Sequence, residues 1–401
     1  MNIAGDGFWS QKITVLDTET TIRAPLPHFG ASPTYPTNWI VALGYIHKEL
    51  GKDSLGERQF YSKQSIIKFV NWVQDENHLL VGHNLPFDLL YLMKYGLRLD
   101  NVNVWDTQKY NYISSGRIDG QISLEQLAKK YRLPFKKDTE IKERFRAGLG
   151  ADEIDKELLT EYLKSDVKVT AQIFNKQLEE YGNYKKTKRE YILEMMYSLK
   201  VTTDITYQGM HFNVEAAKEA KKEKTLLLEV QEERIQERWK GLDNFTNPNS
   251  STQVATALWG GQVKVPVDVQ VLDEGGEPVR YKSGDKKGEL KTKKGFDIKA
   301  LPPLVSQSTI DLFDNRGWEK NASAQALTYI QKYDKGDAVE FSQDVTGLRH
   351  INKTINTYYK PYIDFSVAET IHPTYNHCIT QTGRLSSSKP NMQNMNNKEQ
   401  L

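Results

Sequence analysis

The first 80 residues alternate between short apolar runs and polar segments, the pattern of a mixed α/β domain. Residues 13–20 (ITVLDTET) are β-branched and apolar and predict a strand. A second strand is expected at 39–47, a helix at 63–74 and a further strand at 78–81. Strands and helices that alternate in this way indicate one α/β domain at the start of the chain.

Beyond Ser123 the apolar positions fall mostly at helical spacing. A long helix is predicted from about residue 152 to Gly182, and a lysine-rich run after Tyr184 marks the first domain boundary. Residues 213–240 begin with an asparagine cap and mix apolar positions with dense charge, which predicts a long, largely solvated helix.

A basic segment follows near the middle of the chain. Residues 280–295 (RYKSGDKKGELKTKKG) hold seven Lys or Arg and two acidic residues. Such a segment is either a mobile solvated loop, the more common case, or an element that contacts phosphates. The sequence alone leaves both interpretations open for the region around 260–300.

Composition limits the classes of protein that fit. A chain of 401 residues suggests two or three domains of about 150 residues each. Its 54 Lys and Arg balance 52 Asp and Glu, so a nucleic-acid surface would need local segregation of charge. The single Cys378 excludes an internal disulfide framework and a cysteine-rich zinc cluster. The first residues lack the layout of a secretory signal, so we expect a cytoplasmic protein.

Two acids lie at the end of the first predicted strand. Side chains two apart in a strand share a face, so Asp17 and Glu19 point to the same side as Ile13 and Val15, which suggests a covered face. Two carboxylates there are costly unless a cation lies between them, and Mg²⁺ or Mn²⁺ suits such oxygen ligands. The alternative is an exposed strand end without a ligand.

Three further residues extend this set. Pro86 fits the first position of a helix, which puts Asp88 in the first turn, where the helix dipole alone also favours an acid. Tyr162 and Asp166 are four apart in the long predicted helix and therefore share one face. Each of these features is weak when taken by itself.

In this order, D-x-E, N-x-x-x-D and Y-x-x-x-D resemble the three exonuclease motifs of the 3′ to 5′ proofreading domain in DNA polymerases of the DNA polymerase I type. That domain belongs to the tyrosine-bearing DEDD exonucleases and has an RNase H-like fold. The resemblance implies that Asp17, Glu19, Asp88 and Asp166 hold two divalent ions, Mg²⁺ or Mn²⁺, and that Tyr162 orients the attacking water. Asp106 and the segment SLEQLAKKY also resemble the family, and we expect them to be structural.

The last third of the chain carries a longer match. Residues 380–394 (TGRLSSSKPNMQN with the preceding TQ) are similar to the TGRLSS…PN-x-QN signature that opens the palm of family A polymerases. Upstream residues fit the R-x-x-x-K-x-x-x-TY helix and the thumb pattern N-x-x-S-x-x-Q of that family. The residues that would bind primer–template DNA on this basis are Asn247, Ser250, Gln253, Arg349, Lys353, Thr357, Tyr358, Arg384, Asn391 and Gln393.

The chemistry of these residues agrees with such a role. Arg384 can donate to minor-groove acceptors, Asn391 and Gln393 can contact the same edge, and Lys353 suits a phosphate. The resemblance therefore implies an α/β RNase H-like exonuclease domain at 1–185, a mainly helical thumb at 186–345 and a short, incomplete palm at 346–401. An ordinary glycine turn is the alternative explanation of TGRLSS.

In the family, the polymerase carboxylates follow the QN segment, and here the sequence stops at Leu401. Asp364 and Glu369 imitate a D-x-S-x-x-E palm motif but precede TGRLSS, so we expect surface residues. The sequence resembles phage enzymes most. We therefore expect a proofreading exonuclease that binds primer–template DNA in the host cytoplasm and is completed for synthesis by a second polypeptide.

Other functions compete with this one. A truncated polymerase fragment explains the end at Leu401 equally well. A catalytically silent DNA-binding subunit is a second alternative, against which the intact acids and Tyr162 count. A nuclease of structured RNA is a third, and the duplex-binding thumb pattern disfavours it.

Overall fold

The computed structural model describes most of the chain, in the residue ranges 12–24, 28–49, 56–134, 139–240, 242, 247–273, 275–281 and 286–395. The amino-terminal residues, on which the absence of a secretory signal was judged, lie outside these ranges, as do residues 282–285 of the basic segment. None of the described helices combines the length and the apolar composition that crossing a membrane requires.

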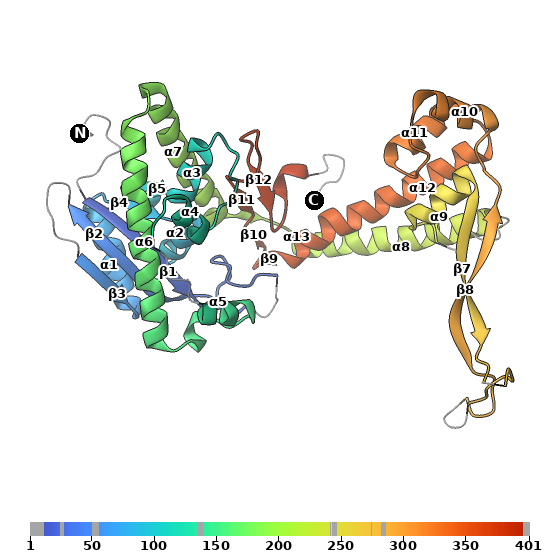
Figure 1. Ribbon diagram of the computed structural model, residues 1–401, viewed down its shortest axis with the longest axis horizontal. Helices are drawn as coiled ribbons and strands as arrows, with labels where there is room; N and C mark the ends of the chain where they lie inside the picture. The colour runs from blue at the N-terminus through green and yellow to red at the C-terminus, as the bar shows by residue number, and fades with distance from the viewer. Residues whose placement is uncertain are drawn as a thin grey trace. The chain divides into compact units, whose positions relative to one another are not determined.

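The chain divides into two compact units (Figure 1). Unit 1 contains residues 1–214 together with 364–400, and unit 2 contains residues 215–363. Packing therefore groups the residues differently from the three functional segments expected from the sequence, whose boundaries stay predictions. The helix that follows the lysine-rich run belongs to unit 1, and so does most of the segment compared with a palm.

Unit 1 is built on a five-stranded mixed sheet with the order β3-β2-β1-β4-β5. The central strand β1 is antiparallel to β2 and parallel to β4, which in turn is parallel to β5. The strands expected near 13–20, 39–47 and 78–81 are confirmed, whereas two short edge strands were not expected. The strands are β1 (Lys12–Thr20), β2 (Ile40–Glu49), β3 (Gly56–Phe60), β4 (Leu79–Gly82) and β5 (Asn103–Asp106).

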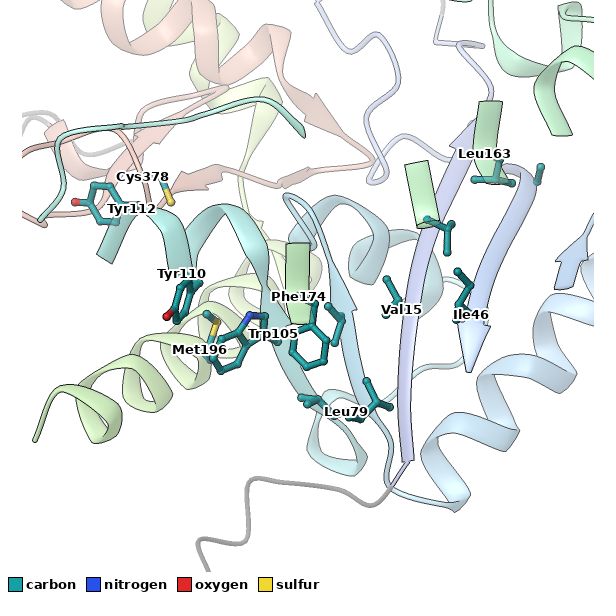
Figure 2. Packing of buried hydrophobic residues seen from close by; sticks show 14 of the residues in the cluster. Val15, Ile46, Leu79, Trp105, Tyr110, Tyr112, Leu163, Phe174, Met196 and Cys378 are labelled. Carbon is teal, nitrogen blue, oxygen red and sulfur yellow. The ribbon is translucent and has the colours of Figure 1, made fainter. Parts of the chain in front are cut away.

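Helices cover both faces of this sheet and bury two separate cores. Ile13 and Val15 of β1 face the long helix α6, and Figure 2 shows Val15 among the buried residues of that core. Leu16, on the opposite face, packs with residues of α1 and α2. The helices of unit 1 are α1 (Lys63–Asp75), α2 (Pro86–Met93), α3 (Thr107–Ser114), α4 (Leu124–Lys130), α5 (Thr139–Arg146), α6 (Lys156–Gly182) and α7 (Lys186–Gln208).

Polar caps fix where several of these helices begin. Ser123 forms a capping box with Gln126 at the start of α4. The long helix α6 starts at Lys156 rather than near residue 152, because Asp155 accepts the first backbone N–H groups and a short 3₁₀ turn occupies residues 151–153. The predicted helix is confirmed, with its start four residues later.

The carboxyl-terminal segment of the described chain returns to unit 1 as short strands. Strands β10 and β9 of this segment form one small sheet with β6, which comes from the first stretch of unit 1. Strand β11 pairs with β12 in an antiparallel hairpin. These strands are β6 (Met210–His211), β9 (Ser366–Val367), β10 (Thr370–Ile371), β11 (Thr374–Asn376) and β12 (Ser386–Ser388). Unit 1 is thus assembled from two distant stretches of sequence.

Unit 2 is mainly helical. Its helix α8 confirms the predicted solvated helix, since Ala217 and Ile235 are its buried residues. A compact core around Phe313 and Phe341 joins the shorter helices. The elements are α8 (Val214–Arg238), α9 (Ser251–Trp259), β7 (Gly261–Gln270), β8 (Thr292–Leu301), α10 (Gln307–Arg316), α11 (Ala324–Tyr333), α12 (Asp337–Lys353), a π-helical stretch (Thr354–Tyr359) and α13 (Lys360–Asp364).

The expectation of a basic loop at about 260–300 is wrong for much of this region. Strands β7 and β8 pair along their full length, from Gly261 opposite Leu301 to Gln270 opposite Thr292, and form a ribbon that extends from the helices of unit 2 (Figure 1). The alternation VKVPVDVQV at 263–271 is the strand signal that sequence reasoning overlooked. Regular pairing replaces the expected loop at 261–270 and 292–301, whereas the described residues 280–281 and 286–291 of the basic segment lie between the two strands.

Candidate active site

Strand β1 brings two carboxylates to the face of the sheet that α6 covers. Asp17 and Glu19 share one face of β1 with Ile13 and Val15, as the strand period of two requires, and those two residues lie in the core below α6. Glu19 is only 8% exposed and Asp17 is half-buried. The expectation that this face is covered is therefore confirmed.

A glycine lets α6 approach these carboxylates closely. Gly44 of β2 lies opposite Asp17 in the antiparallel register. A Cβ atom at this position would lie 2.7 Å from Cγ of Leu163, a distance that van der Waals repulsion forbids. Leu163 is buried in α6, next to Tyr162, so the missing side chain at residue 44 lets α6 lie close to β2, opposite Asp17.

Helix α2 supplies the third carboxylate from beyond the end of β4. Pro86 begins the helix and Asp88 lies in its first turn, where it is 3% exposed. Oδ1 of Asp88 accepts hydrogen bonds from the backbone N–H of Thr18, at 2.9 Å, and from the Thr18 hydroxyl, at 2.6 Å. Thr18 thus orients Asp88, a role that the sequence did not reveal.

Asp106 holds the start of α2 in place as well as that of α3. Its Oδ1 accepts the N–H groups of Gln108 and Lys109, at 2.7 and 2.9 Å, as the N-cap of α3. Its Oδ2 accepts the N–H of Leu85 at 2.8 Å, directly before α2. One buried carboxylate therefore joins two helix starts, in keeping with the structural role expected for it.

Helix α6 adds the fourth carboxylate and a phenol. Asp166 and Tyr162 are hydrogen bonded to each other, one helical turn apart. The ring of Phe145 in α5 contacts Tyr162 edge-on, with centroids 6.3 Å apart. Lys142, also in α5, lies near enough to lower the pKa of Asp166, and sequence reasoning missed this cation because nothing local marks it.

The four carboxylates act on one another electrostatically. Burial and then the charge of Asp88 raise the pKa of Asp17 well above its ordinary value, and burial followed by Asp166 does the same for the pKa of Glu19. Burial raises the pKa of Asp88 to about 7, against two hydrogen bonds from Thr18. It raises the pKa of Asp166 to about 6, against the Tyr162 hydrogen bond and Lys142. The structure thus brings all four together.

The chemistry of this cluster suits divalent cations. The charged neighbours that shift the pKa values of Asp17 and Glu19 are all carboxylates, so these acids resist carrying charge together unless a cation or a proton offsets it. Carboxylate oxygens are the ligands that Mg²⁺ and Mn²⁺ prefer. Among the described residues, no three His, Cys, Asp or Glu side chains are arranged to hold an ion as they stand.

The raised pKa values predict that the ion-free protein is destabilised as the pH rises. For Asp88, the folded state holds its proton up to about pH 7, whereas the unfolded state loses it near pH 4, so stability falls across that window. In EDTA, the free energy of unfolding of an Asp88→Asn variant should be closer to that of wild type at pH 5 and should exceed it at pH 8. The difference in free energy of unfolding between variant and wild type should grow by roughly 3 kcal/mol from pH 5 to pH 8. Chemical denaturation at both pH values measures this difference.

The pH dependence of wild-type stability alone would not isolate the effect of Asp88, because two buried histidines change the stability in the opposite direction. Burial lowers the pKa of His78 to about 4 and that of His377 to about 3. Because of these two groups, the stability of the folded protein increases as the pH rises toward 6.5. Both histidines are present in wild type and in Asp88→Asn, and their contribution cancels in the comparison. A difference in free energy of unfolding that stays constant between pH 5 and pH 8 would contradict the raised pKa of Asp88.

The expected DNA-contacting residues of unit 2 lie on neighbouring elements. Ser250 caps α9 by accepting the N–H of Gln253, whose side chain accepts the N–H of Asn247 at 2.8 Å. Arg349 of α12 donates to the hydroxyl of Ser251 at 3.4 Å, which places α12 beside this turn. Further along the same helical stretch, Lys353 and Thr357 are exposed and Tyr358 is half-buried.

The remaining expected DNA contacts belong to unit 1. Arg384 is exposed and follows the left-handed Gly383. Asn391 caps a short 3₁₀ turn by accepting the N–H of Gln393 at 3.0 Å, and both side chains are exposed. Glu369 is exposed as expected of a surface residue, whereas Asp364 is half-buried and its carbonyl contacts His28.

Comparison with known proteins identifies two regions of the chain. Residues 55–181 match the family described as 3′-5′ exonuclease, a range that includes Asp88, Tyr162 and Asp166, and residues 308–401 match the family described as DNA polymerase family A. No curated protein matches the chain.

A solved structure is similar over nearly the whole chain. It is the POL domain of Pol1 from M. smegmatis in complex with DNA primer-template and dNTP, with a TM-score of 0.53 and 13% sequence identity. The similarity covers 97% of the present chain and 53% of the other, so the chain spans about half the length of that relative. At 13% identity, this similarity shows a shared fold alone.

Proposed function

We propose that unit 1 removes nucleotides from the 3′ ends of DNA by metal-dependent hydrolysis. The chain contains a 3′-5′ exonuclease domain and part of a family A DNA polymerase domain, which supports this proposal. The observation that carries this proposal is the convergence of four carboxylates from β1, α2 and α6 into one buried, mutually repelling cluster. That the fold of this domain is RNase H-like is part of the same proposal.

In this proposal Asp17, Glu19, Asp88 and Asp166 hold two divalent ions, Mg²⁺ or Mn²⁺. Bound ions of this kind lower the pKa of a coordinated water and neutralise charge on a leaving oxygen. Burial and Asp166 raise the pKa of the Tyr162 phenol, so it stays protonated and can hold a water by hydrogen bonding. Covering of the face by α6 limits access of bulk water to the carboxylates.

The direct test uses the full chain with a 5′-labelled single-stranded oligodeoxynucleotide. With Mg²⁺ or Mn²⁺ we expect stepwise shortening by one nucleotide and release of mononucleotides, and EDTA should stop both. Gel electrophoresis of the label and chromatography of the released nucleotides measure this. If neither ion supports shortening, while duplex DNA still binds, the chain is a silent DNA-binding subunit instead.

We further propose that unit 2 and the carboxyl-terminal segment bind primer–template DNA. Support comes from the match of residues 308–401 to family A polymerases and from the exposed Lys353, Arg384 and Gln393. Phosphate contacts by cations such as Lys353 and Arg384 carry much of the affinity of DNA-binding proteins. A phage origin, a cytoplasmic location and a second polypeptide that completes DNA synthesis stay predictions, the last testable by co-purification.

A further inference from the structure

The loop of residues 380–384, here called the TGR loop, is anchored to the end of α3 in unit 1. The hydroxyl of Tyr112, in α3, donates to the carbonyl of Thr380 at 2.6 Å. Nη1 of Arg117, just after α3, donates to the carbonyl of Thr382 at 3.0 Å. Two side chains from the first part of the sequence therefore hold two backbone carbonyls of one loop some 265 residues away in the sequence.

Two further hydrogen bonds hold Arg117 in place. Its Nη2 donates to the hydroxyl of Tyr191 in α7 at 2.8 Å, and its backbone N–H donates to the carbonyl of Tyr112 at 2.7 Å. A Cβ atom on Gly383 would lie 2.6 Å from Cζ of Arg117, so the guanidinium packs directly against this glycine. Gly383 also has a φ of +80°, which favours glycine.

A buried polar contact fixes the chain just before the loop. His377 is 8% exposed and lies between Thr202 of α7, at 2.5 Å from Nε2, and Lys109 of α3, at 3.3 Å from Nδ1. The next residue, Cys378, is buried near Tyr112, as Figure 2 shows. Helices α3 and α7 thus set both the position and the direction in which the chain enters the TGR loop.

Inside the loop, the backbone is closed and the arginine side chain is left open. The N–H of Gly383 donates to the carbonyl of Thr380 at 3.1 Å, and the Thr380 hydroxyl donates to the carbonyl of Arg384 at 2.6 Å. The side chain of Arg384 is exposed. The loop therefore presents one exposed cation, and hydrogen bonds hold its backbone at the carbonyls of Thr380, Thr382 and Arg384.

We propose that Tyr112 and Arg117 are positioning residues, through which the exonuclease domain sets the TGR loop for duplex DNA. The proposal rests on the proposed DNA contact of Arg384. A loop that is ordered before binding loses less conformational entropy when DNA binds, so its anchors raise affinity without touching the ligand. Part of the DNA-binding surface of the polymerase segment is, on this view, built by the nuclease fold.

Binding of the full chain to a fluorescent primer–template duplex in EDTA tests this proposal. Tyr112→Phe removes only the hydroxyl that reaches Thr380 and should weaken binding about fivefold, and Arg117→Ala about tenfold. The matched control is Tyr110→Phe, which removes a buried hydroxyl from the same helix and should bind as wild type does. Because Tyr112 is only 2% exposed and its hydroxyl donates to the carbonyl of Thr380, its effect is not a lost phosphate contact. Wild-type affinity in Tyr112→Phe and Arg117→Ala would overturn the positioning.

A double-mutant cycle separates positioning from direct contact. If Arg117 acts through Arg384, the Arg117→Ala, Arg384→Ala double variant should bind no more weakly than Arg384→Ala alone. Additive losses would mean that Arg117 contacts DNA itself and would overturn the proposal. Unchanged binding in Arg384→Ala would instead refute the proposed contact on which it rests. Equal thermal unfolding midpoints across the variants exclude misfolding as the cause of weaker binding.

Discussion

The double variant Asp17→Asn, Glu19→Gln is expected to release mononucleotides from single-stranded DNA roughly 10³-fold more slowly than wild type, or not measurably. Both substitutions keep the size of the side chain and remove its charge. Metal-bound sites contribute several kcal/mol to such hydrolysis, and each 1.4 kcal/mol is about a factor of ten in rate. Time courses with a 5′-labelled oligonucleotide at saturating Mg²⁺ measure the effect.

A matched control removes two negative charges elsewhere in unit 1. Asp75 ends α1 and Glu161 lies on α6 beside Tyr162, and both side chains are exposed. The Asp75→Asn, Glu161→Gln variant should hydrolyse DNA at the wild-type rate. The active-site variant should also unfold no more easily than wild type, because it relieves the repulsion that raises the pKa values of Asp17 and Glu19. Hydrolysis within tenfold of wild type would remove Asp17 and Glu19 from the mechanism.

The second large effect concerns the orientation of Asp88. Thr18→Val removes the hydroxyl that donates to Oδ1 of Asp88 at 2.6 Å and keeps the size and branching of the side chain. Groups that orient a metal ligand typically contribute about 10- to 100-fold in metal affinity. We therefore expect Thr18→Val to bind Mn²⁺ about tenfold more weakly, measured by titration calorimetry without DNA.

Thr18→Ser is the conservative partner in this experiment, because it retains the hydroxyl and should restore wild-type Mn²⁺ affinity. At saturating Mn²⁺ the hydrolysis rate of Thr18→Val should recover most of its loss, since the hydroxyl acts on the ligand and not on DNA. Equal Mn²⁺ affinity in wild type and Thr18→Val would show that the hydrogen bond to Asp88 has no bearing on metal binding.

Features with a strong local pattern could be predicted from the sequence. The apolar alternation that ends in Asp17 and Glu19 gave the central strand and its covered face, and the four-residue spacing of Tyr162 and Asp166 gave their common helical face. The order of the three motifs then suggested that these residues meet. Whether they perform catalysis stays a prediction that the variants above address.

Features that depend on approach between distant elements could not be predicted. Thr18 lies between two motif residues, but its hydrogen bond to Asp88 depends on α2 reaching the opposite face of β1. Lys142 reaches the neighbourhood of Asp166 only because α5 packs beside α6. Gly44 gave no signal, since its role requires the side chain of Leu163 above it.

The region of the β7–β8 ribbon shows a different limit. The lysines of 280–295 favour a loop by their charge, whereas valines at every second position of 263–271 favour a strand. Charge describes the surface of a segment, whereas periodicity describes its backbone. The period of two in the apolar residues thus predicts the first strand of the ribbon.

The assembly of unit 1 from residues 1–214 and 364–400 affects how the protein forms during synthesis. Strand β6 can pair only after β10 has been synthesised, since His211 of β6 lies opposite Thr370 of β10. In the same way, Lys109 and Thr202 can form their contacts with His377 only after that residue has been synthesised. A nascent chain therefore leaves this side of the first unit open on the ribosome while the intervening 149 residues of the second emerge. At about 5–20 residues per second, this interval lasts on the order of ten seconds, during which chaperones can reach surfaces that the finished molecule buries.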